Sequence, residues 1–402
     1  MSDFINTLNG YLWGPIMIVL CLGVAIIYSV VLKFPQIRLF KSMVHYLTKG
    51  SSSENGISSF QGFAMALGGR VGVGNIAGVA TAIFYGGPGA LFWMWVYALL
   101  GAASAFAEST AGQIWKTEDN GEYCGGPAQY IARGLRCKPL AILYALAAVL
   151  AFGLTGPTVQ SYNIADSMRN AFHVPPLVTG IVIAILFAVI VAGGAKRIGS
   201  FASYVVPFMA GVYIVLMIII LGTNITRVPA MFGLIFRCAF NKEAAFGAIF
   251  GSTIMWGVKR GVYSSEAGQG SGAQASSAAE VSHPVKQGLA QAFSVYIDTL
   301  VVCTATGLMI LAPAAITSST APATRSSRPF PALSPVPVTP RQRSTPSSPA
   351  SVPLSLPSLF CSSHSPHCFR SATMPSPTLS SSRATKRRPR SSVPSLSQFR
   401  FS

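Results

Sequence analysis

Long apolar runs, separated by short polar segments, fill the first 311 positions of the chain. A helix needs about 20 apolar residues to cross a hydrocarbon core about 30 Å thick, and only helices or closed barrels satisfy their own backbone hydrogen bonds in lipid. Eight segments meet or approach that length: 12–32, 61–86, 88–107, 139–165, 174–195, 198–226, 244–263 and 287–311. The pattern predicts an all-α polytopic membrane protein with about eight transmembrane helices.

Two of these segments are poorly suited to a continuous helix. The segment 61–86 carries five glycines between Phe63 and Gly78, with Arg70 and Asn75 near its middle. The segment 244–263 reaches Lys259 and Arg260 after 15 uncharged residues and then enters a stretch rich in glycine and serine. Glycine is a weak helix former, so both segments are predicted to be interrupted.

The two interrupted segments lie five spans apart. This spacing predicts inverted five-helix repeats, with a first repeat over 61–226 and part of a second over 244–311. Interrupted helices at matching places in two repeats are typical of transporters that bind their substrate at the membrane midplane. The alternative is that the glycines only allow close packing between helices.

The positive charges alternate along the chain. Lysines and arginines follow the first, third, fifth and seventh apolar segments: Lys33, Arg38, Lys41, Lys49, Lys116, Arg133, Arg136, Lys138, Lys196, Arg197, Lys259, Arg260 and Lys286. Cytoplasmic loops carry the excess of such residues, which places the N-terminus outside a bacterial inner membrane. The first apolar segment has no basic stretch before it and no cleavage pattern after it, so we expect a retained helix rather than a signal peptide.

Composition agrees with a membrane protein and separates a tail from the rest. The chain of 402 residues is 51% hydrophobic and only 10% charged. Eleven of its 29 lysines and arginines follow Leu311, where there is no acidic residue; subtracting these 11 from the formal net charge of +18 leaves +7 for the first 311 residues. Because the excess charge lies in one Ser/Pro-rich segment rather than on a folded face, we expect no nucleic-acid partner.

Three sequence blocks resemble one known family. The run Gly86–Gly101, GGPGALFWMWVYALLG, is similar along its whole length to the signature of the alanine or glycine:cation symporters. The runs Gly72–Ile83 and Met255–Ser271 are similar to two other blocks of that family. The resemblance covers about residues 1–311 and implies the leucine-transporter type of inverted-repeat fold. Members usually have eleven spans, so the fold is expected to be incomplete here.

The composition changes from about residue 312. The last 91 residues hold 16 of the 27 prolines and no apolar run long enough to cross a bilayer. Such a segment cannot bury a core, so we expect 1–311 to form the transport domain and 312–402 to be a disordered tail. A shifted reading frame is our hypothesis for its origin.

A zwitterionic substrate requires hydrogen-bond donors for its carboxylate and acceptors for its ammonium group. In the interrupted segment 61–86, the amides of Val73 and Gly74 are predicted to face the carboxylate. Opposite them, Thr253 and Ile254 would supply carbonyl and hydroxyl groups, and Trp256 would shape a small cavity, unless it is only a packing or interfacial tryptophan. Gln160 is a further candidate for binding the substrate, or it only caps a helix.

The candidate cation ligands are oxygen groups. The carbonyl of Arg70 and the carbonyl and hydroxyl of Thr253 are predicted to face a cation, and Asn75 is assigned as a sodium ligand by its resemblance to the unwound motif of distant carriers of this fold. Asp298 is the one charged residue between Gln287 and Leu311, and a carboxylate inside a bilayer usually faces a cation or a partner. No cofactor or transition metal is expected, since sodium prefers oxygen ligands.

The resemblance implies a secondary active symporter that couples sodium or proton entry to uptake of alanine or glycine by alternating access, without enzymatic chemistry. One alternative is an inactive truncated remnant of such a carrier. A less favoured alternative is a polytopic membrane enzyme, which would need a nucleophile or metal constellation that the sequence does not display.

Overall fold

The protein is described here from a computed structural model that covers residues 2–48, 56–119, 122–240 and 247–319. Apart from one short hairpin, these residues form helices joined by short connections. The predicted tail 312–402 lies outside the described residues from position 320 onward.

The chain begins with four helices and then enters the first interrupted segment. The bounds are α1 Ser2–Leu12, α2 Pro15–Val31, α3 Pro35–Arg38, α4 Phe40–Thr48, α5 Ser59–Arg70, the π-helical η1 Gly74–Gly78 and α6 Val79–Gly86. The start of α5 is fixed by a capping box, in which the Ser58 hydroxyl accepts from the Gln61 amide and the Gln61 side chain accepts from the Ser58 amide.

A long central helix and a hairpin follow. The bounds are α7 Ala90–Ile114, β1 Thr117–Asp119, β2 Glu122–Cys124 and α8 Pro127–Arg133, and the two strands pair antiparallel with Glu118 opposite Tyr123. The outer helices come next: α9 Lys138–Ala148, the π-helical η2 Val149–Thr155, α10 Gly156–Phe172, α11 Pro176–Val191, α12 Gly194–Thr223, the 3₁₀ turn η3 Ile225–Arg227 and α13 Val228–Ala239.

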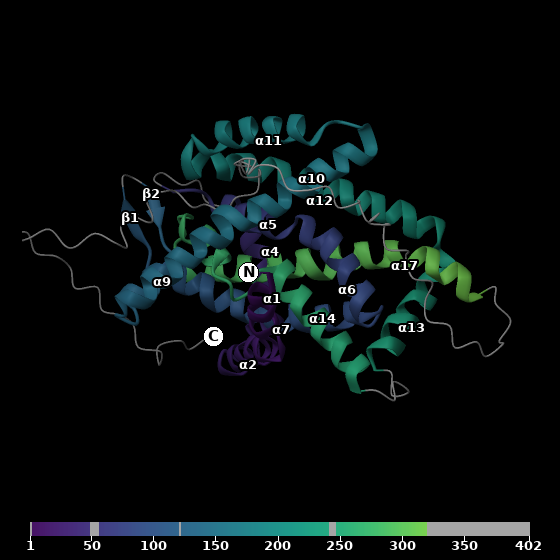
Figure 1. The fold of residues 1–402 in the computed structure, drawn as a ribbon. Coiled ribbons are helices and arrows are strands. Elements are labelled where there is room, and N and C mark those ends of the chain that lie inside the picture. The colour runs from purple at the N-terminus through teal and green to yellow at the C-terminus, as the bar shows by residue number, and fades with distance from the viewer. Residues whose placement is uncertain (1, 49–55, 120–121, 241–246, 320–402) are drawn as a thin grey trace, which may run out of the picture.

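The last described elements return to the centre of the molecule. They are α14 Gly247–Ser265, α15 Ser271–Ser277, α16 Pro284–Val295, the π-helical η4 Tyr296–Cys303 and α17 Thr304–Ser319. Segments distant in sequence therefore meet around α7, which packs against α14, α15 and α16 (Figure 1).

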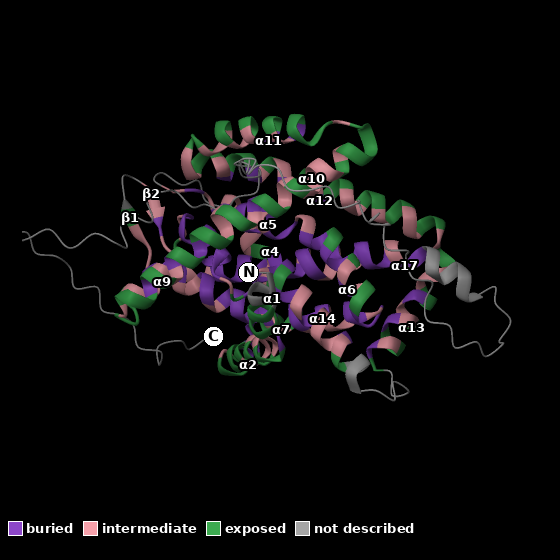
Figure 2. Cartoon of the chain, viewed as in Figure 1, coloured by how far each residue is buried: buried purple, intermediate pink, exposed green. Residues whose placement is uncertain are grey.

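Burial separates a central group of helices from an outer group. In the most apolar window of α7 61% of the residues are buried, and in that of Pro284–Ala312 67%, against 11% in that of Gly194–Thr223. Figure 2 shows the buried residues along the middle of the molecule and exposed residues on α2, α11 and α12. Large apolar side chains on these outer helices, such as Val31, Leu177 and Phe208, are exposed, as expected of surfaces that face lipid.

The helices agree with a polytopic membrane protein, although the predicted number of eight spans is not confirmed. Among the described residues, five helices are long and apolar enough to cross a membrane: Thr7–Val31, Ala90–Ile114, Lys138–Phe172, Gly194–Thr223 and Pro284–Ala312. The pair Ser59–Arg70 and Gly74–Gly86 passes the same test together and bends by 49° at its break. The predicted spans 174–195 and 244–263 correspond to a 16-residue apolar helix and to α14, which do not reach that standard by themselves.

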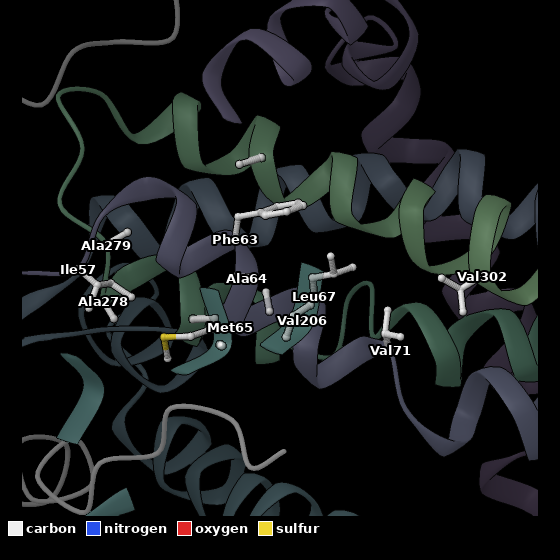
Figure 3. Close-up of a cluster of buried hydrophobic side chains, with 14 residues drawn as sticks. Ile57, Phe63, Ala64, Met65, Leu67, Val71, Val206, Ala278, Ala279 and Val302 are labelled. Atoms are coloured by element: carbon white, nitrogen blue, oxygen red, sulfur yellow. The ribbon is translucent and has the colours of Figure 1, made fainter. Parts of the chain in front are cut away.

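A hydrophobic cluster extends along α5 toward its break. Ile57 pairs with Ala279 in an isolated parallel bridge, and Phe63 and Leu67 continue the cluster. Figure 3 shows Ile57, Ala278 and Ala279 at one end and Val71 and Val302 at the other. This packing fixes the end of α5 against the segment that contains Asp298.

Glycine allows the closest approach between α14 and α7. A Cβ atom at Gly257 would lie 2.5 Å from the Ala90 carbonyl oxygen and 2.5 Å from Trp93 Cβ. At Gly251, on the same helix, a Cβ atom would have nothing within 4 Å. Alanine substitutions at Gly257 and Gly251 therefore distinguish the effect of close packing from the effect of helix propensity.

We expect Gly257→Ala to destabilise the protein by about 1–3 kcal/mol, because the added methyl group must push backbone aside in a packed interior. Gly251→Ala is the matched control and should leave stability unchanged or slightly higher. Thermal unfolding of the purified variants in one detergent measures both. Equal stability of the two variants would contradict the packing between α14 and α7.

Candidate functional site

The first break lies between α5 and η1, and side chains from two elements satisfy its backbone. Val71 leaves the helix with φ −79° and ψ 96°. The Gly72 amide donates to Asn75 Oδ1 at 3.0 Å, and the Val73 amide donates to Gln160 Oε1 at 3.1 Å. Predicted site residues from the second and fourth apolar segments therefore meet at this break.

The glycines at this break make room for neighbouring side chains. A Cβ atom at Gly72 would lie 2.9 Å from Gln160 Nε2, and one at Gly74 would lie 3.3 Å from the ring of Tyr263. The amide of Val73 and the backbone of Gly74 thus face Gln160 of α10 on one side and Tyr263 of α14 on the other.

Asp298 lies at the centre of a buried polar cluster next to the same break. Asn75 Nδ2 donates to Asp298 Oδ1 at 2.6 Å, whereas the hydroxyls of Ser264 and Thr299 donate to Oδ2 at 2.9 Å and 2.8 Å. The Cys303 sulfur lies 3.4 Å from Asn75 Nδ2 and 3.2 Å from the Ser264 hydroxyl. All five side chains are buried.

Widened helical turns carry both ends of this cluster. Asn75 lies in the π-helical η1 and Asp298 in the π-helical η4, and these two elements contact each other. Single π-helical turns inside helices are frequent at functional sites because they redirect side chains and free backbone groups. The cluster of Asn75, Asp298, Ser264 and Thr299 offers oxygen atoms from three chain segments, which suits a hard cation.

The second break follows α14 rather than interrupting it. Glu266, Gly268 and Gly270 have positive φ values of 49°, 86° and 92°, and the chain resumes as a helix at Ser271. The predicted interruption is therefore present, but it begins after Ser265, at the glycine-rich stretch.

Buried side chains satisfy the backbone of this second break. Arg70 Nε donates to the Ser265 carbonyl at 2.6 Å, and Glu108 Oε2 accepts from the Gly270 amide at 3.0 Å. The hydroxyls of Tyr97 and Tyr144 donate to the carbonyls of Ala267 and Gln269 at 2.9 Å and 3.0 Å.

Arg70 connects the two breaks. It is the last residue of α5, and besides Ser265 its guanidinium donates through Nη1 to Gln291 Oε1 at 3.1 Å and to the Ser294 hydroxyl. Its Nη2 and Glu108 Oε1 have no hydrogen-bond partner among the described residues. The buried Glu108 is therefore not hydrogen-bonded to Arg70.

Three predicted residues of the segment 244–263 lie elsewhere. Thr253, Ile254 and Trp256 belong to the continuous helix α14 and not to a break. The Thr253 hydroxyl donates to the Gly86 carbonyl at 2.7 Å, at the end of α6 remote from the first break. The Trp256 ring stacks on Tyr85 at a centroid distance of 4.7 Å. The structure does not bring these three side chains into the Asp298 cluster.

Ser264, Cys303 and Tyr263 are site residues that the sequence pattern did not indicate. Ser264 and Tyr263 stand in the Tyr-Ser-Ser-Glu run before the second break, which marked a discontinuity but not a contact with Asp298. Within the described residues there is no group of three or more His, Cys, Asp and Glu side chains that could hold a metal ion.

Comparison with known proteins agrees with the blocks singled out in the sequence. A family model described as "Sodium:alanine symporter family" matches residues 1–328. The chain is 54% identical over 311 residues to the putative sodium/proton-dependent alanine carrier protein YrbD of Bacillus subtilis, an alignment that covers 77% of this chain and 64% of that protein.

Two further relatives extend this likeness. The sodium/proton-dependent alanine carrier protein of Bacillus sp. strain PS3 is 50% identical over 274 residues, which are 67% of this chain and 60% of the relative. The sodium/alanine symporter AgcS of Methanococcus maripaludis is 44% identical over 317 residues, which are 77% of this chain and 70% of the relative. The aligned part of the chain thus spans about 60–64% of the first two relatives. By this family match and these identities, the chain belongs to the sodium:alanine symporter family.

Proposed function

We propose that this protein is a secondary active symporter that couples the entry of sodium to the uptake of a small neutral amino acid, alanine or glycine. The observation that carries the proposal is the buried contact between Asn75 Nδ2 and Asp298 Oδ1 at 2.6 Å, directly beside an interrupted helix. An ionisable side chain buried inside a bilayer marks an ion pathway by default.

The cation would bind at the Asp298 cluster. Asp298 supplies a carboxylate, and the hydroxyl oxygens of Ser264 and Thr299 keep lone pairs free for a cation while they donate to the carboxylate. Sodium entry would offset the negative charge of Asp298, which has no cationic side chain among its hydrogen-bond partners. The Arg70 carbonyl remains a proposed contributor, whereas the Thr253 hydroxyl, which donates to the Gly86 carbonyl, lies outside this cluster.

The amino acid would bind at the first break. Gln160 Oε1 accepts from the Val73 amide, which is the group that we assign to the substrate carboxylate. A carboxylate is a stronger acceptor than a neutral amide oxygen, so a substrate would displace the Gln160 oxygen. Gly74 and Tyr263 are close together here, since a Cβ atom at Gly74 would lie 3.3 Å from the Tyr263 ring, and this crowding supports a small substrate side chain. Ile254 and Trp256 are proposed to line the path from the α6 side.

Alternating access would use the connection between the two breaks. Arg70 ends α5 and is hydrogen-bonded to the end of α14, so movement at one break would be transmitted to the other. Two breaks joined in this way support the leucine-transporter type of inverted repeat, and the distribution of lysines and arginines supports an N-terminus outside the inner membrane. We retain both as part of the proposal, together with the eight spans.

One observation favours a second candidate, an inactive remnant of such a carrier. The chain aligns with only 60–64% of the first two relatives, so the rest of those relatives has no counterpart in the aligned region. Uptake of labelled alanine into proteoliposomes, with and without an inward sodium gradient, separates the two candidates. Sodium-stimulated uptake supports the symporter, and a folded protein without it supports the remnant.

Asn75→Ala should raise the sodium concentration needed for half-maximal alanine uptake roughly tenfold to a hundredfold. The reason is that a hydrogen bond to a charged group contributes about 1.5–3 kcal/mol, and Asp298 would lose its shortest one. Asp298→Asn should abolish sodium stimulation altogether. Sodium titrations of uptake at saturating alanine give both values.

The control for these two variants is Asp166→Asn, which removes a carboxylate from an exposed pair with Arg169 on α10. It should leave the sodium titration unchanged. Sodium activation of Asn75→Ala equal to that of the unaltered protein would remove Asn75 from the cation site.

Gln160→Ala should change the KM for alanine by about tenfold. The sodium concentration needed for half-maximal uptake should stay nearly the same. The Val73 amide loses its resting partner, and an unsatisfied buried amide costs about 1–3 kcal/mol. Asn163→Ala is the matched control, because its side chain lies on the same helix, is partly exposed and donates to the Val159 carbonyl. Identical KM values for the two variants would show that Gln160 takes no part in substrate binding.

A further inference from the structure

Three buried carboxylates lie around one buried guanidinium. Arg70 interacts electrostatically with Glu266, Glu108 and Asp298, and it is 2% exposed. With all four groups ionised, this part of the protein would hold two uncompensated negative charges. Uncompensated charge in a dry interior is costly, so cations or protons must offset it. One cation at Asp298 offsets one of the two charges.

The hydrogen bonds identify where the second charge lies. Asp298 accepts from three side chains, and Glu266 Oε2 accepts from the Ser271 hydroxyl at 2.5 Å. Glu108 Oε2 accepts from the Gly270 amide, but its Oε1 is buried without a hydrogen-bond partner. Among the described residues, Glu108 Oε1 is the one carboxylate oxygen that is buried without a hydrogen-bond partner, and Glu108 is only 9% exposed.

Among the described residues, Arg70 and Glu108 do not form a direct ion pair. A Cβ atom at Gly272 would lie 2.6 Å from Arg70 Nη2, 3.3 Å from Glu108 Oε1 and 3.5 Å from the Ser109 hydroxyl. These three atoms are all buried without partners. The three atoms therefore lie around the position that a Gly272 Cβ atom would occupy, and they do not form hydrogen bonds with one another.

We propose that Glu108 carries a proton and is a second ion site of the protein, distinct from the sodium site at Asp298. The inference rests on the proposed symport and assigns its second coupling ion, a proton, to one residue. A neutral carboxylic acid at Glu108 removes the remaining uncompensated charge, and it needs no cationic partner.

The proton would act on the second break. The Gly270 amide donates to Glu108 Oε2, and a hydrogen bond to an ionised acceptor is roughly twice as strong as one to a neutral acceptor. Protonation therefore weakens the attachment of the Glu266–Gly270 turn to α7, and deprotonation strengthens it. The titratable groups that face Glu108 are on α5, the turn after α14, α7, α8 and α9: Arg70, Glu266, Tyr97, Tyr130 and Tyr144.

Infrared spectroscopy of the purified full-length chain tests the proton directly. The carbonyl-stretch band of a protonated carboxylic acid should be present in the unaltered protein and lost in Glu108→Gln, which keeps the size and the acceptor oxygen of the side chain. The exposed Asp166→Asn variant is the control and should retain the band. A band of unchanged intensity in Glu108→Gln would overturn the proposal.

Chemical labelling of the unaltered protein gives a second test that does not depend on the folding of a variant. Dicyclohexylcarbodiimide reacts with protonated carboxyl groups in apolar surroundings, so we expect Glu108 to be modified, with modification declining as the pH rises. Peptide mass spectrometry locates the label. Absence of label at Glu108 across the pH range would contradict the assignment.

Uptake assays separate this inference from the proposed function. In proteoliposomes, Glu108→Gln should remove the dependence of alanine uptake on pH, whereas the exposed Asp166→Asn variant should retain that dependence. If the unaltered chain shows no sodium-stimulated uptake, the symport proposal fails, whereas the infrared band and the label still decide whether Glu108 is protonated. If alanine uptake by Glu108→Gln depends on pH as it does in the unaltered protein, a coupling role for the Glu108 proton is refuted.

Discussion

The structure depends on the requirement that every backbone group freed inside a bilayer must find a partner within the protein. Water is absent there, and each unsatisfied group costs several kcal/mol. At the first break Asn75 and Gln160 accept from the amides of Gly72 and Val73, and at the second Arg70 and Glu108 bind the backbone on either side of the turn. The side chains that make the interruptions tolerable are therefore those that a solute would meet.

Buried charged side chains are subject to the same requirement for partners within the protein. Arg70 is hydrogen-bonded to carbonyl, amide and hydroxyl oxygens, so its charge stabilises the ends of two helices and is shared among three carboxylates at a distance. This arrangement leaves Asp298 and Glu108 without a direct cationic partner. In the proposed symporter, ions that enter and leave would supply the missing charge. Loading of these sites would then change hydrogen bonds at the breaks.

Close packing keeps these groups in place. Small residues let α14, α15 and α16 approach α7, as at Gly257 and Gly288, where a Cβ atom would meet α7 at 2.5 Å and 2.1 Å. The outer helices α11 and α12 are largely exposed and contribute little to the buried centre. The family match over residues 1–328 includes both groups of helices, which agrees with a shared arrangement of centre and periphery.

The order of apolar segments and glycines was sufficient to predict a helical membrane protein and the break near Arg70, because these depend on local hydrophobicity and helix propensity. Asp298 could be chosen as the one charged residue of its apolar run, and Asn75 by its resemblance to the unwound motif of distant carriers. Their contact, the participation of Ser264 and Cys303, and the placement of Thr253 beside Gly86 depend on how distant helices pack. Only the tertiary structure decides these contacts, because a side chain's partner across 223 positions is set by helix rotation and crossing, which a local pattern does not encode.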